Sequence, residues 1–443
     1  MANILETAPH DWKYVSEGGA TIVFSYTRSA HSDFDGMVLR LRKISLKKSA
    51  TEGPDNACGE EPDDPTIEYQ TKCMQGLIPP EHLPRLQTVH LDRSWLEELS
   101  RLHNSTRPEN RRAKDEIDLK RKKGVLATDL VGGNWLAVEI KPKWAFLPSP
   151  IHLSEETRSI KTQTCRFCMH SHLRARGSQE EITNYCPLDL FSGDKTRILK
   201  AIHDLWDAWV ASNATVNNLK IFARGKFVTP SEAHVMLSEN EAAGEEFSVI
   251  RDAFASALVE PLLRTPVLHI LSDLQRDLDA LDIEGLSRLW RLTESSAILN
   301  QTNPSQASES VPTSTPLGVT SRCIQAPDPT ISDWIDFVHN YSSPDKPTLD
   351  HSNPSPDHLR YYILAYLLSA TFKDCSVIVK LDFLQSCTTA SNVTPNSVTV
   401  IDLDPKKVDK LKDWEKLDQE IVRTYASANK KTCIDAWKSP NTT

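Results

Sequence analysis

The sequence predicts an α+β protein with two lobes, and three observations lead to this expectation. The chain has 443 residues, which exceeds the usual size of one compact core. Hydrophobic residues make up 39% and charged residues 25%, as in soluble globular proteins. Strand-like segments dominate the chain before residue 140, whereas helical patterns dominate after it. We expect an N-terminal lobe over residues 1–135 and a C-terminal lobe over residues 136–443.

Charge and hydropathy argue against two classes of protein. The formal net charge is -9 and the pI about 5.9, whereas a general nucleic-acid binder carries a basic surplus. The longest apolar run, residues 361–372, is shorter than the roughly 20 residues that cross a bilayer, and it predicts a buried helix. Nine cysteines form no dense framework, and residues 1–4 show no signal peptide. We expect a nuclear or cytoplasmic monomer that contacts neither nucleic acid directly nor membrane.

The N-terminal segment predicts three strands. Residues 12–17 and 22–26 alternate around a turn that contains Gly18 and Gly19, and residues 37–43 form a third strand. Backbone N–H groups in such a turn can approach phosphates, but a plain hairpin turn is the alternative.

A lysine pair follows two further predicted strands, residues 124–130 and 135–140. The turn signal at residues 132–134 predicts that these strands form a hairpin. Lys141 and Lys143 then stand at i, i+2, on one face of an extended segment, with Pro142 stiffening it. Two parallel ammonium groups suit an anion with several phosphates; the alternative is a solvated strand edge.

A helical segment at residues 164–174 carries a second cationic pattern. Arg166, His170 and Arg174 stand at i, i+4 and i+8, along one helical face. The stripe predicts an anion-binding face, or alternatively a solvated surface. Cys165 and Cys168 form a C-x-x-C without a second pair at zinc spacing, so we expect no metal there.

Two carboxylates stand at predicted strand ends near the C-terminus. Asp374 begins one predicted strand and Asp402 ends another. Such a carboxylate can hold Mg²⁺, and a second can activate a hydroxyl for phosphoryl transfer. The alternative is an ordinary turn or cap residue. Lys406, Lys410 and Trp414 follow at four-residue intervals into a predicted helix, which places them on one face.

Several short motifs occur in one order and together identify a resemblance. They are Glu139-Ile-Lys-Pro-Lys with Phe-Leu-Pro, the Arg166/His170/Arg174 spacing, Pro187-Leu-Asp-Leu-Phe-Ser-Gly, Asn217-Asn218, Lys373-Asp-Cys-Ser, and Asp402-Leu-x-x-Lys. From Trp12 to about Tyr425 the chain resembles the inositol-pentakisphosphate 2-kinases. The resemblance implies a two-lobed inositol-phosphate kinase fold, distantly like protein kinases. It implies transfer of the ATP γ-phosphate, with Mg²⁺, to the axial 2-hydroxyl of inositol 1,3,4,5,6-pentakisphosphate, giving hexakisphosphate (phytate).

The resemblance also implies roles for individual residues. The glycine-rich nucleotide loop matches Glu17, Gly18, Gly19, Ala20 and Thr21. Other nucleotide-side positions are Arg40, the adenine-side hinge Thr128, Asp129 and Leu130, and Glu139. The inositol phosphates match Lys141, Lys143, Arg166, His170, Arg174, Asn217, Asn218, Lys406, Lys410 and Trp414, with Arg111 a looser match. Asp374 matches the residue that activates the 2-hydroxyl, and Asp402 the magnesium ligand.

The chain departs from the resemblance at a few places. Arg174 and Lys410 exchange lysine and arginine, and Trp414 replaces tyrosine. The Cys/His zinc cluster of plant relatives has no counterpart, so the expectation is no structural zinc. Residues 301–330 and 342–357, rich in Ser, Thr and Pro, predict flexible insertions without assigned function.

Rival interpretations keep the fold but change the role. A noncatalytic inositol-phosphate sensor predicts loss of Asp374 or Asp402, and both are present. A scaffold would use the insertions as binding segments. A protein kinase is disfavoured because the chain has neither a His-Arg-Asp catalytic loop nor an Asp-Phe-Gly segment.

Overall fold

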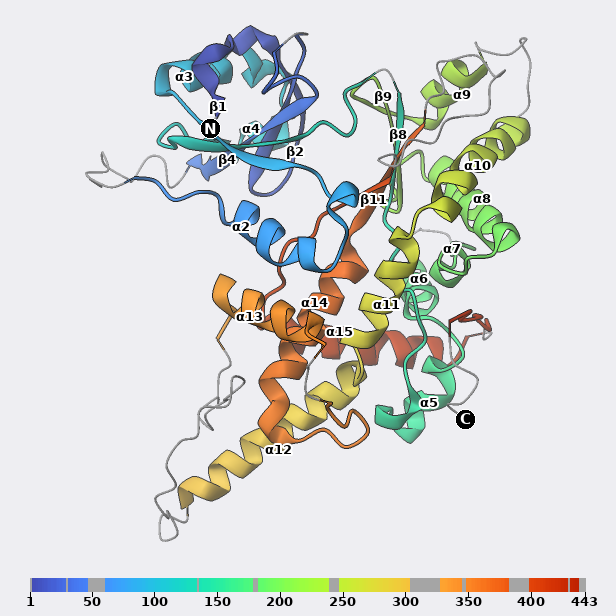
Figure 1. The fold of residues 1–443 in the computed structure, drawn as a ribbon. Coiled ribbons are helices and arrows are strands. Elements are labelled where there is room, and N and C mark those ends of the chain that lie inside the picture. Colours follow the sequence, from blue (N-terminus) through green and yellow to red (C-terminus); the bar gives the residue numbers. More distant parts are fainter. Residues whose placement is uncertain are drawn as a thin grey trace.

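Two β-sheets, each lined by its own hydrophobic core, organise the chain (Figure 1). The computed structural model describes residues 2–28, 31–46, 60–133, 135–177, 182–238, 247–302, 327–344, 348–381, 398–428 and 431–437. Helices cluster mainly after residue 150, around the second sheet. The protein is therefore a mixed α+β protein, as the sequence predicts.

The first sheet has seven strands in the order β1-β5-β7-β4-β3-β2, with β6 beside β4. The strands are β1 (Ala2–Asn3), β2 (Trp12–Glu17), β3 (Thr21–Tyr26), β4 (Met37–Ser45), β5 (Leu86–His90), β6 (Asp115–Ile117) and β7 (Lys123–Thr128). The three predicted N-terminal strands correspond to β2, β3 and β4, which pair antiparallel. Side chains at every second position, such as Leu39 and Leu41 of β4, are buried in one core with Phe24 of β3. This two-residue repeat is what a sheet with one buried face requires.

The second sheet has five antiparallel strands in the order β10-β9-β8-β11-β12. The strands are β8 (Leu136–Ile140), β9 (Leu219–Ala223), β10 (Lys226–Val228), β11 (Ser376–Leu381) and β12 (Val398–Ile401). The hairpin predicted for residues 124–140 is wrong, because β7 pairs with β4 and β5, whereas β8 pairs with β9 and β11. The turn residues 129–133 instead lead from one sheet to the other, and Asn134 lies outside the described residues.

The helices surround both sheets. They are α2 (Pro65–Lys72), α3 (Arg93–His103), α4 (Glu109–Arg112), α5 (Glu155–Lys161), α6 (Arg166–Gly177), α7 (Pro187–Leu190), α8 (Lys195–Ala211), α9 (Pro230–Ser238), α10 (Phe247–Arg264), α11 (Val267–Leu278), α12 (Asp282–Thr302), α13 (Ile331–Ser342), α14 (Leu359–Asp374) and α15 (Lys410–Tyr425). The apolar run 361–372 forms most of α14, the buried helix that the sequence predicts. α10 continues through Pro261, whereas Pro266 separates α10 from α11.

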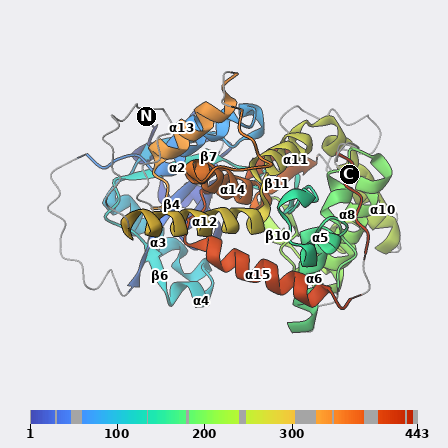
Figure 2. The ribbon, with the colours of Figure 1, turned by 90° about the horizontal axis from the view of Figure 1, so that it is seen from below.

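A smaller core joins three helices that are distant in sequence. Ile160 of α5, Met169 of α6, and Ile421, Val422 and Tyr425 of α15 pack together. Seen from below, α15 runs between α12 and α6 (Figure 2). This packing fixes α6 against the C-terminal helix.

No single helix among the described residues is long and apolar enough to cross a membrane. One bent pair, α10 with α11–α12, passes that test by length and composition only.

Residues 303–326 and 345–347 of the two predicted insertions lie outside the described residues. Tyr69, Met74 and Leu83 precede residue 135 but pack into the core of the second sheet.

Candidate active site

The second sheet brings the predicted C-terminal site residues to one edge. β11 runs antiparallel to both β8 and β12, so the start of β11 lies beside the ends of its neighbours. The register pairs Val377 with Ile140 and Ser376 with Ile401. Residues just beyond these pairs, among them Lys141, Asp374 and Asp402, therefore meet at that edge.

Asp374 lies among three ammonium groups there. Its carboxylate oxygens are 3.1 Å from Lys143 Nζ, 3.1 Å from Lys406 Nζ and 3.7 Å from Lys141 Nζ. Burial raises the pKa of Asp374, but Lys143, Lys406 and Lys141 outweigh burial and lower that pKa to about 2. The carboxylate side chain is still 48% exposed, so the cluster is open to a ligand.

The backbone that carries Asp374, Lys141 and Lys143 differs from the sequence prediction. Asp374 is the last residue of α14 and does not begin a strand. β8 ends at Ile140, and Lys143 has φ +72°, so the expected extended segment with both lysines on one face is wrong. Both ammonium groups nevertheless reach Asp374, because the left-handed residue redirects the chain after Pro142.

A second carboxylate group lies beside the first. The hydroxyl of buried Ser376 lies 3.0 Å from Glu139 Oε1 and 3.1 Å from Asp402 Oδ2. Glu139 also pairs with Lys220 at 3.0 Å, and Lys141 lies 3.8 Å from Asp402. Asp402 is 52% exposed, and oxygen donors of this kind fit Mg²⁺. Ser376 belongs to the Lys373-Asp-Cys-Ser motif, but no pattern in the sequence predicts that it bridges the two carboxylates.

Helix α6 presents its cationic stripe toward these lysines. Burial, Arg166, Arg174 and Lys143 together lower the pKa of His170 to about 4. Burial also lowers the pKa of Lys143, and Lys141 and Arg174 act in the same direction. His170 is thus a neutral member of the stripe near pH 7, and the positive charge comes from Arg166, Arg174 and the lysines.

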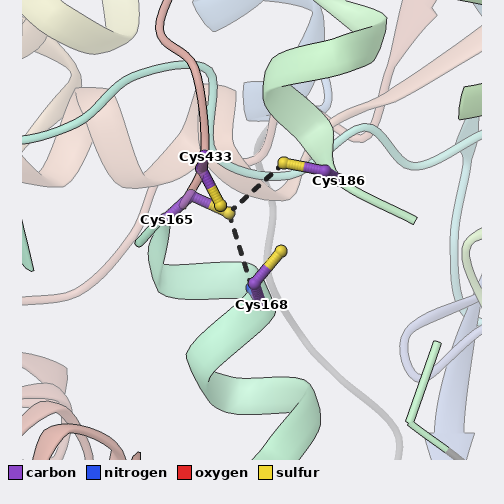
Figure 3. A group of neighbouring side chains, drawn as sticks. All are labelled: Cys165, Cys168, Cys186 and Cys433. Atoms are coloured by element: carbon purple, nitrogen blue, oxygen red, sulfur yellow. Dashed lines mark hydrogen bonds between the residues drawn. The ribbon is translucent and has the colours of Figure 1, made fainter. Parts of the chain in front are cut away.

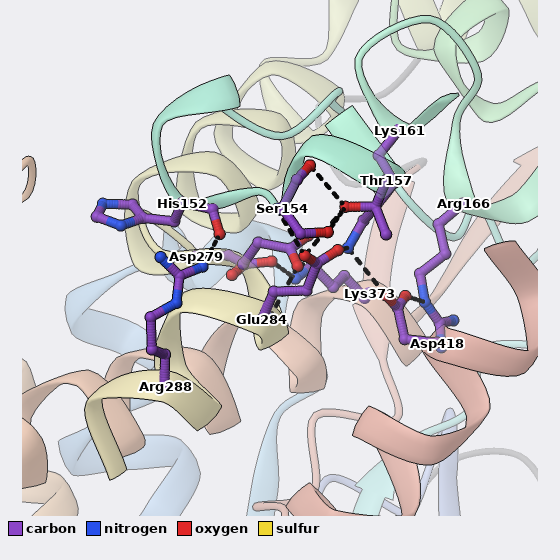
Figure 4. A network of polar contacts seen from close by, with 11 residues as sticks. His152, Ser154, Thr157, Lys161, Arg166, Asp279, Glu284, Arg288, Lys373 and Asp418 are labelled. Carbon is purple, nitrogen blue, oxygen red and sulfur yellow. Dashed lines mark hydrogen bonds and ion pairs between the residues drawn. The ribbon is translucent and has the colours of Figure 1, made fainter. Parts of the chain in front are cut away.

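A buried ionic network, absent from the sequence prediction, holds Arg166 in place (Figure 4). Asp418 of α15 accepts from Arg166 Nε at 2.8 Å and from Lys161 Nζ at 2.8 Å. Arg166 also stacks over Trp144 at 4.6 Å from the ring centroid. The partners of Asp418 thus come from α5 and α6, not from its own helix.

The three residues at four-residue intervals share a region but not one helix. Lys406 precedes α15, Lys410 begins it, and Trp414 lies one turn further on. The prediction that all three lie on one helical face is therefore wrong for Lys406. Trp414 packs on the core near Tyr366, and Lys410 is exposed.

The asparagine pair stands at the same sheet edge. Asn218 Nδ2 donates to the Lys141 carbonyl at 3.0 Å, and the Asn218 carbonyl accepts from Lys141 N at 3.0 Å. These bonds fix the backbone that carries Lys141. Asn217 is exposed beside it.

The predicted nucleotide loop is the turn between β2 and β3. Gly18, Gly19 and Ala20 are exposed, and Gly18 N donates to the Thr21 carbonyl at 2.9 Å. The Glu17 side chain, 1% exposed, pairs with Arg107 at 2.8 Å and Lys43 at 3.1 Å. The Glu17 side chain therefore anchors the loop through these ion pairs. Only the backbone of Glu17 is available to a ligand.

Two further cations lie at the first sheet. Arg40 is partly buried on β4, on the face opposite to buried Leu39 and Leu41. Arg111 lies on α4 and acts electrostatically on Tyr14 of β2. Arg40 lies on the first sheet and Arg111 on a helix that contacts it, whereas the lysine cluster lies at the edge of the second sheet.

The predicted hinge is built around the Asp129 side chain. Its carboxylate accepts from the Ser25 hydroxyl, from Val131 N at 2.9 Å and from Gly132 N at 2.6 Å. Thr128 exchanges hydrogen bonds with Arg85, and partly buried Leu130 accepts from the Trp135 indole at 3.2 Å. These bonds order the turn that joins the sheets.

Lys380, which the sequence prediction missed, links this hinge to β11. Its ammonium lies 4.4 Å from the Trp135 ring centroid and 3.3 Å from the Asp129 carbonyl. No motif marked Lys380, because its role depends on a strand distant in sequence.

The expectation about the C-x-x-C motif rested on a missing second pair, and that argument is wrong. Cys186 and Cys433 complete a buried group with Cys165 and Cys168, in which all ligand atoms lie within 4.8 Å of one another (Figure 3). No local spacing relates Cys433 to the other three, so the pattern is invisible in the sequence.

A family profile and several named proteins that are similar to this chain all carry the same family name. The profile of a family described as Inositol-pentakisphosphate 2-kinase matches residues 14–420. A protein of Cryptococcus neoformans named "Inositol-pentakisphosphate 2-kinase" is 32% identical over 431 residues, covering 95% of this chain and 94% of that protein. A rice (Oryza sativa subsp. indica) protein named "Inositol-pentakisphosphate 2-kinase IPK1" is 31% identical over 459 residues, covering 94% and 93%. An Arabidopsis thaliana protein with the same activity in its name is 24% identical over 467 residues.

Proposed function

The chain belongs to the inositol-pentakisphosphate 2-kinase family, and we propose that it phosphorylates inositol 1,3,4,5,6-pentakisphosphate with ATP. The γ-phosphoryl group passes to the 2-hydroxyl, giving ADP, inositol hexakisphosphate and a proton. The observation that carries this proposal is the cluster of Asp374 with Lys141, Lys143 and Lys406, faced by the stripe of α6. A substrate with five phosphates needs cations that converge from separate segments, and this cluster draws on several.

The fold assignment is part of the same proposal. We propose that the two sheets with their helices are the two lobes of an inositol-phosphate kinase, distantly like a protein kinase. ATP would lie between the glycine turn after β2, the hinge at Thr128–Leu130 and Glu139. The protein would act as a nuclear or cytoplasmic monomer.

In this proposal Asp374 accepts the proton of the substrate hydroxyl. A carboxylate with a pKa of about 2 is a weak base, because three lysines stabilise its charged form. Substrate phosphates compete for the same lysines, so binding shifts the pKa of Asp374 upward. The base would thus gain strength only when the substrate is in place.

The metal proposal involves the neighbouring carboxylates. Asp402, with Glu139 and the Ser376 hydroxyl beside it, would hold Mg²⁺. When bound, this ion supplies charge neutralisation on the transferring phosphates. Lys220 Nζ, 3.0 Å from Glu139 Oε1, supplies the opposite charge beside Glu139.

The deciding experiment is incubation of the purified protein with ATP, Mg²⁺ and inositol 1,3,4,5,6-pentakisphosphate, with the products separated by anion exchange. Appearance of hexakisphosphate supports the proposal. Tight binding of the pentakisphosphate without product would favour the sensor or scaffold alternative, which has no specific support in the site. Neither binding nor product would contradict both.

A further inference from the structure

Gln275 of α11 is fully buried, and its side-chain amide makes three hydrogen bonds to the backbone of other segments. Its Oε1 accepts from Ala145 N at 2.9 Å. Its Nε2 donates to the Lys143 carbonyl at 3.1 Å and to the Phe372 carbonyl at 3.1 Å. One amide thus joins the chain around the lysine pair to the end of α14, the helix whose last residue is Asp374.

The three hydrogen bonds fit only one orientation of the Gln275 amide. With oxygen and nitrogen exchanged, the NH₂ group would face the Ala145 N–H, and the amide oxygen would face two carbonyl oxygens. A carboxylate cannot donate to those carbonyls, and an apolar side chain makes none of the bonds. This position therefore uses both functions of a primary amide.

The segment 141–147 depends on side chains for its support, because β8 ends at Ile140. The Tyr185 hydroxyl donates to the Pro142 carbonyl at 2.9 Å and so holds the peptide group before Lys143. Gln275 holds the peptide group after Lys143. Buried backbone groups need such partners, and here the partners fix both sides of one residue.

The conformation of that residue gives the support its importance. Lys143 has φ +72°, a left-handed value that residues with a side chain rarely adopt. Such conformations persist where the surrounding contacts determine them, and they are concentrated at functional sites. In this conformation Lys143 Nζ lies 3.1 Å from Asp374 Oδ1.

We propose that Gln275 is a positioning residue that holds the Lys143 backbone against the end of α14, so that the Lys143 ammonium meets both Asp374 and a substrate phosphate. This inference rests on the proposed function, which supplies the phosphate. The alternative is an amide that only stabilises the packing of α11. That alternative predicts a loss of stability without a selective effect on Lys143.

The first test needs no substrate. Gln275→Met nearly keeps the length of the side chain but removes all three hydrogen bonds. Lys141 and Lys143 form a matched pair for amine labelling, because their side chains are 17% and 18% exposed. Mass spectrometry of peptide fragments should show that Lys143 reacts severalfold faster in the variant. Lys141, whose backbone Asn218 holds, should change less than about twofold. Unchanged Lys143 labelling, or an equal change at both lysines, would overturn the proposal.

A double-mutant cycle gives the second test. In the native background, Gln275→Met should weaken pentakisphosphate binding about tenfold, because one charge-assisted contact is misplaced. In the Lys143→Ala background the same replacement should cost less than about twofold, because the ammonium is already absent. Calorimetry measures both losses, with ATP as the comparison ligand. Equal weakening in the two backgrounds would show that Gln275 does not act through Lys143.

Ser369→Ala is the matched control for general loosening of the packing. The Ser369 hydroxyl donates to the Gln275 backbone carbonyl at 2.8 Å, so this variant loses a buried hydrogen bond between α14 and α11 but keeps the amide. It should lower the stability and leave Lys143 labelling within about twofold. If Gln275→Met fails to fold, Gln275→Asn takes its place, because the shorter amide cannot reach all three partners. Native labelling of Lys143 in that variant would overturn the proposal.

The labelling does not depend on kinase activity, so the two proposals can fail separately. Faster labelling of Lys143 in Gln275→Met, in a protein that does not bind pentakisphosphate, would contradict the proposed function alone. Pentakisphosphate turnover by the native chain, with unchanged labelling and binding in Gln275→Met, would contradict the positioning role alone.

Discussion

Two ionic clusters interact with residues of α6 and differ in charge balance and burial. Around Asp374, lysines outnumber the carboxylate they contact, and the Asp374 side chain is 48% exposed. Around Lys161, one ammonium donates to Asp282 at 2.6 Å, Asp418 at 2.8 Å and Glu284 at 3.1 Å, and Lys161 is only 3% exposed. An excess of ammonium groups in an open place suits an anionic ligand, whereas a cation enclosed by carboxylates in a closed place suits the fold.

The second cluster also shows why acidic groups need not mean metal. Asp282, Glu284 and Asp418 lie close enough to hold an ion. The Lys161 ammonium already lies among all three and supplies the positive charge. Burial, opposed by Lys161, leaves the pKa of Asp282 raised to about 6. This network is a structural support for α5, α6 and α15.

Asp374→Asn tests whether the open cluster around Asp374 carries the chemistry, and it should have the largest effect. The amide cannot accept the hydroxyl proton, so turnover should fall by about 10³-fold, while pentakisphosphate binding changes little because the lysines stay. The measurement is a steady-state rate beside calorimetric binding. Turnover close to that of the native chain would remove Asp374 from the role of base.

Lys161→Met tests whether the closed cluster around Lys161 stabilises the fold. Buried Asp418 and the partly buried Asp282 and Glu284 lose the ammonium between them, so the free energy of unfolding should drop by about 3–5 kcal/mol in chemical denaturation. The control is Lys200→Met, whose ammonium pairs with Asp204 on a surface where such pairs contribute about 0–1 kcal/mol. An equal effect of both variants would show that burial does not distinguish the clusters.

The double variant Lys141→Ala and Lys143→Ala separates substrate from nucleotide. Losing two charge-assisted contacts should weaken pentakisphosphate binding by about 10- to 100-fold. ATP binding should change less than about threefold, because these lysines follow a strand of the second sheet whereas the glycine turn belongs to the first. Calorimetry with each ligand gives both numbers, and equal losses would argue against a substrate-side location.

The smallest expected effect concerns His170. Its pKa is lowered to about 4 in the folded chain, and bound phosphates should raise it toward the ordinary 6.5. Binding then takes up a proton, so pentakisphosphate affinity should rise as pH falls from 7 to 5, by severalfold beyond that of His170→Gln. Parallel pH profiles of the two proteins would mean that His170 stays neutral on binding. Because the folded pKa lies below the unfolded one, stability from this group is complete above about pH 6.5 and is lost as pH falls toward 4.

The sequence by itself determined the local elements and much of the site's composition. Alternation predicted β2, β3 and β4, and the apolar run 361–372 predicted the buried helix α14, because these patterns act over a few residues. Ordered motifs identified Asp374, Lys141 and Lys143 as neighbours in function before any contact was known.

Only the tertiary structure decided which distant segments meet. The turn after β7 leads into a second sheet because β8 finds its hydrogen-bond partners in β9 and β11, far along the chain. Asp418 binds Arg166 and Lys161, and Cys433 joins Cys165, through the packing of α15 and the C-terminal segment on α6. Spacing encodes the geometry of one helix or strand, whereas such pairings depend on the sum of many burial and hydrogen-bond terms across the whole fold.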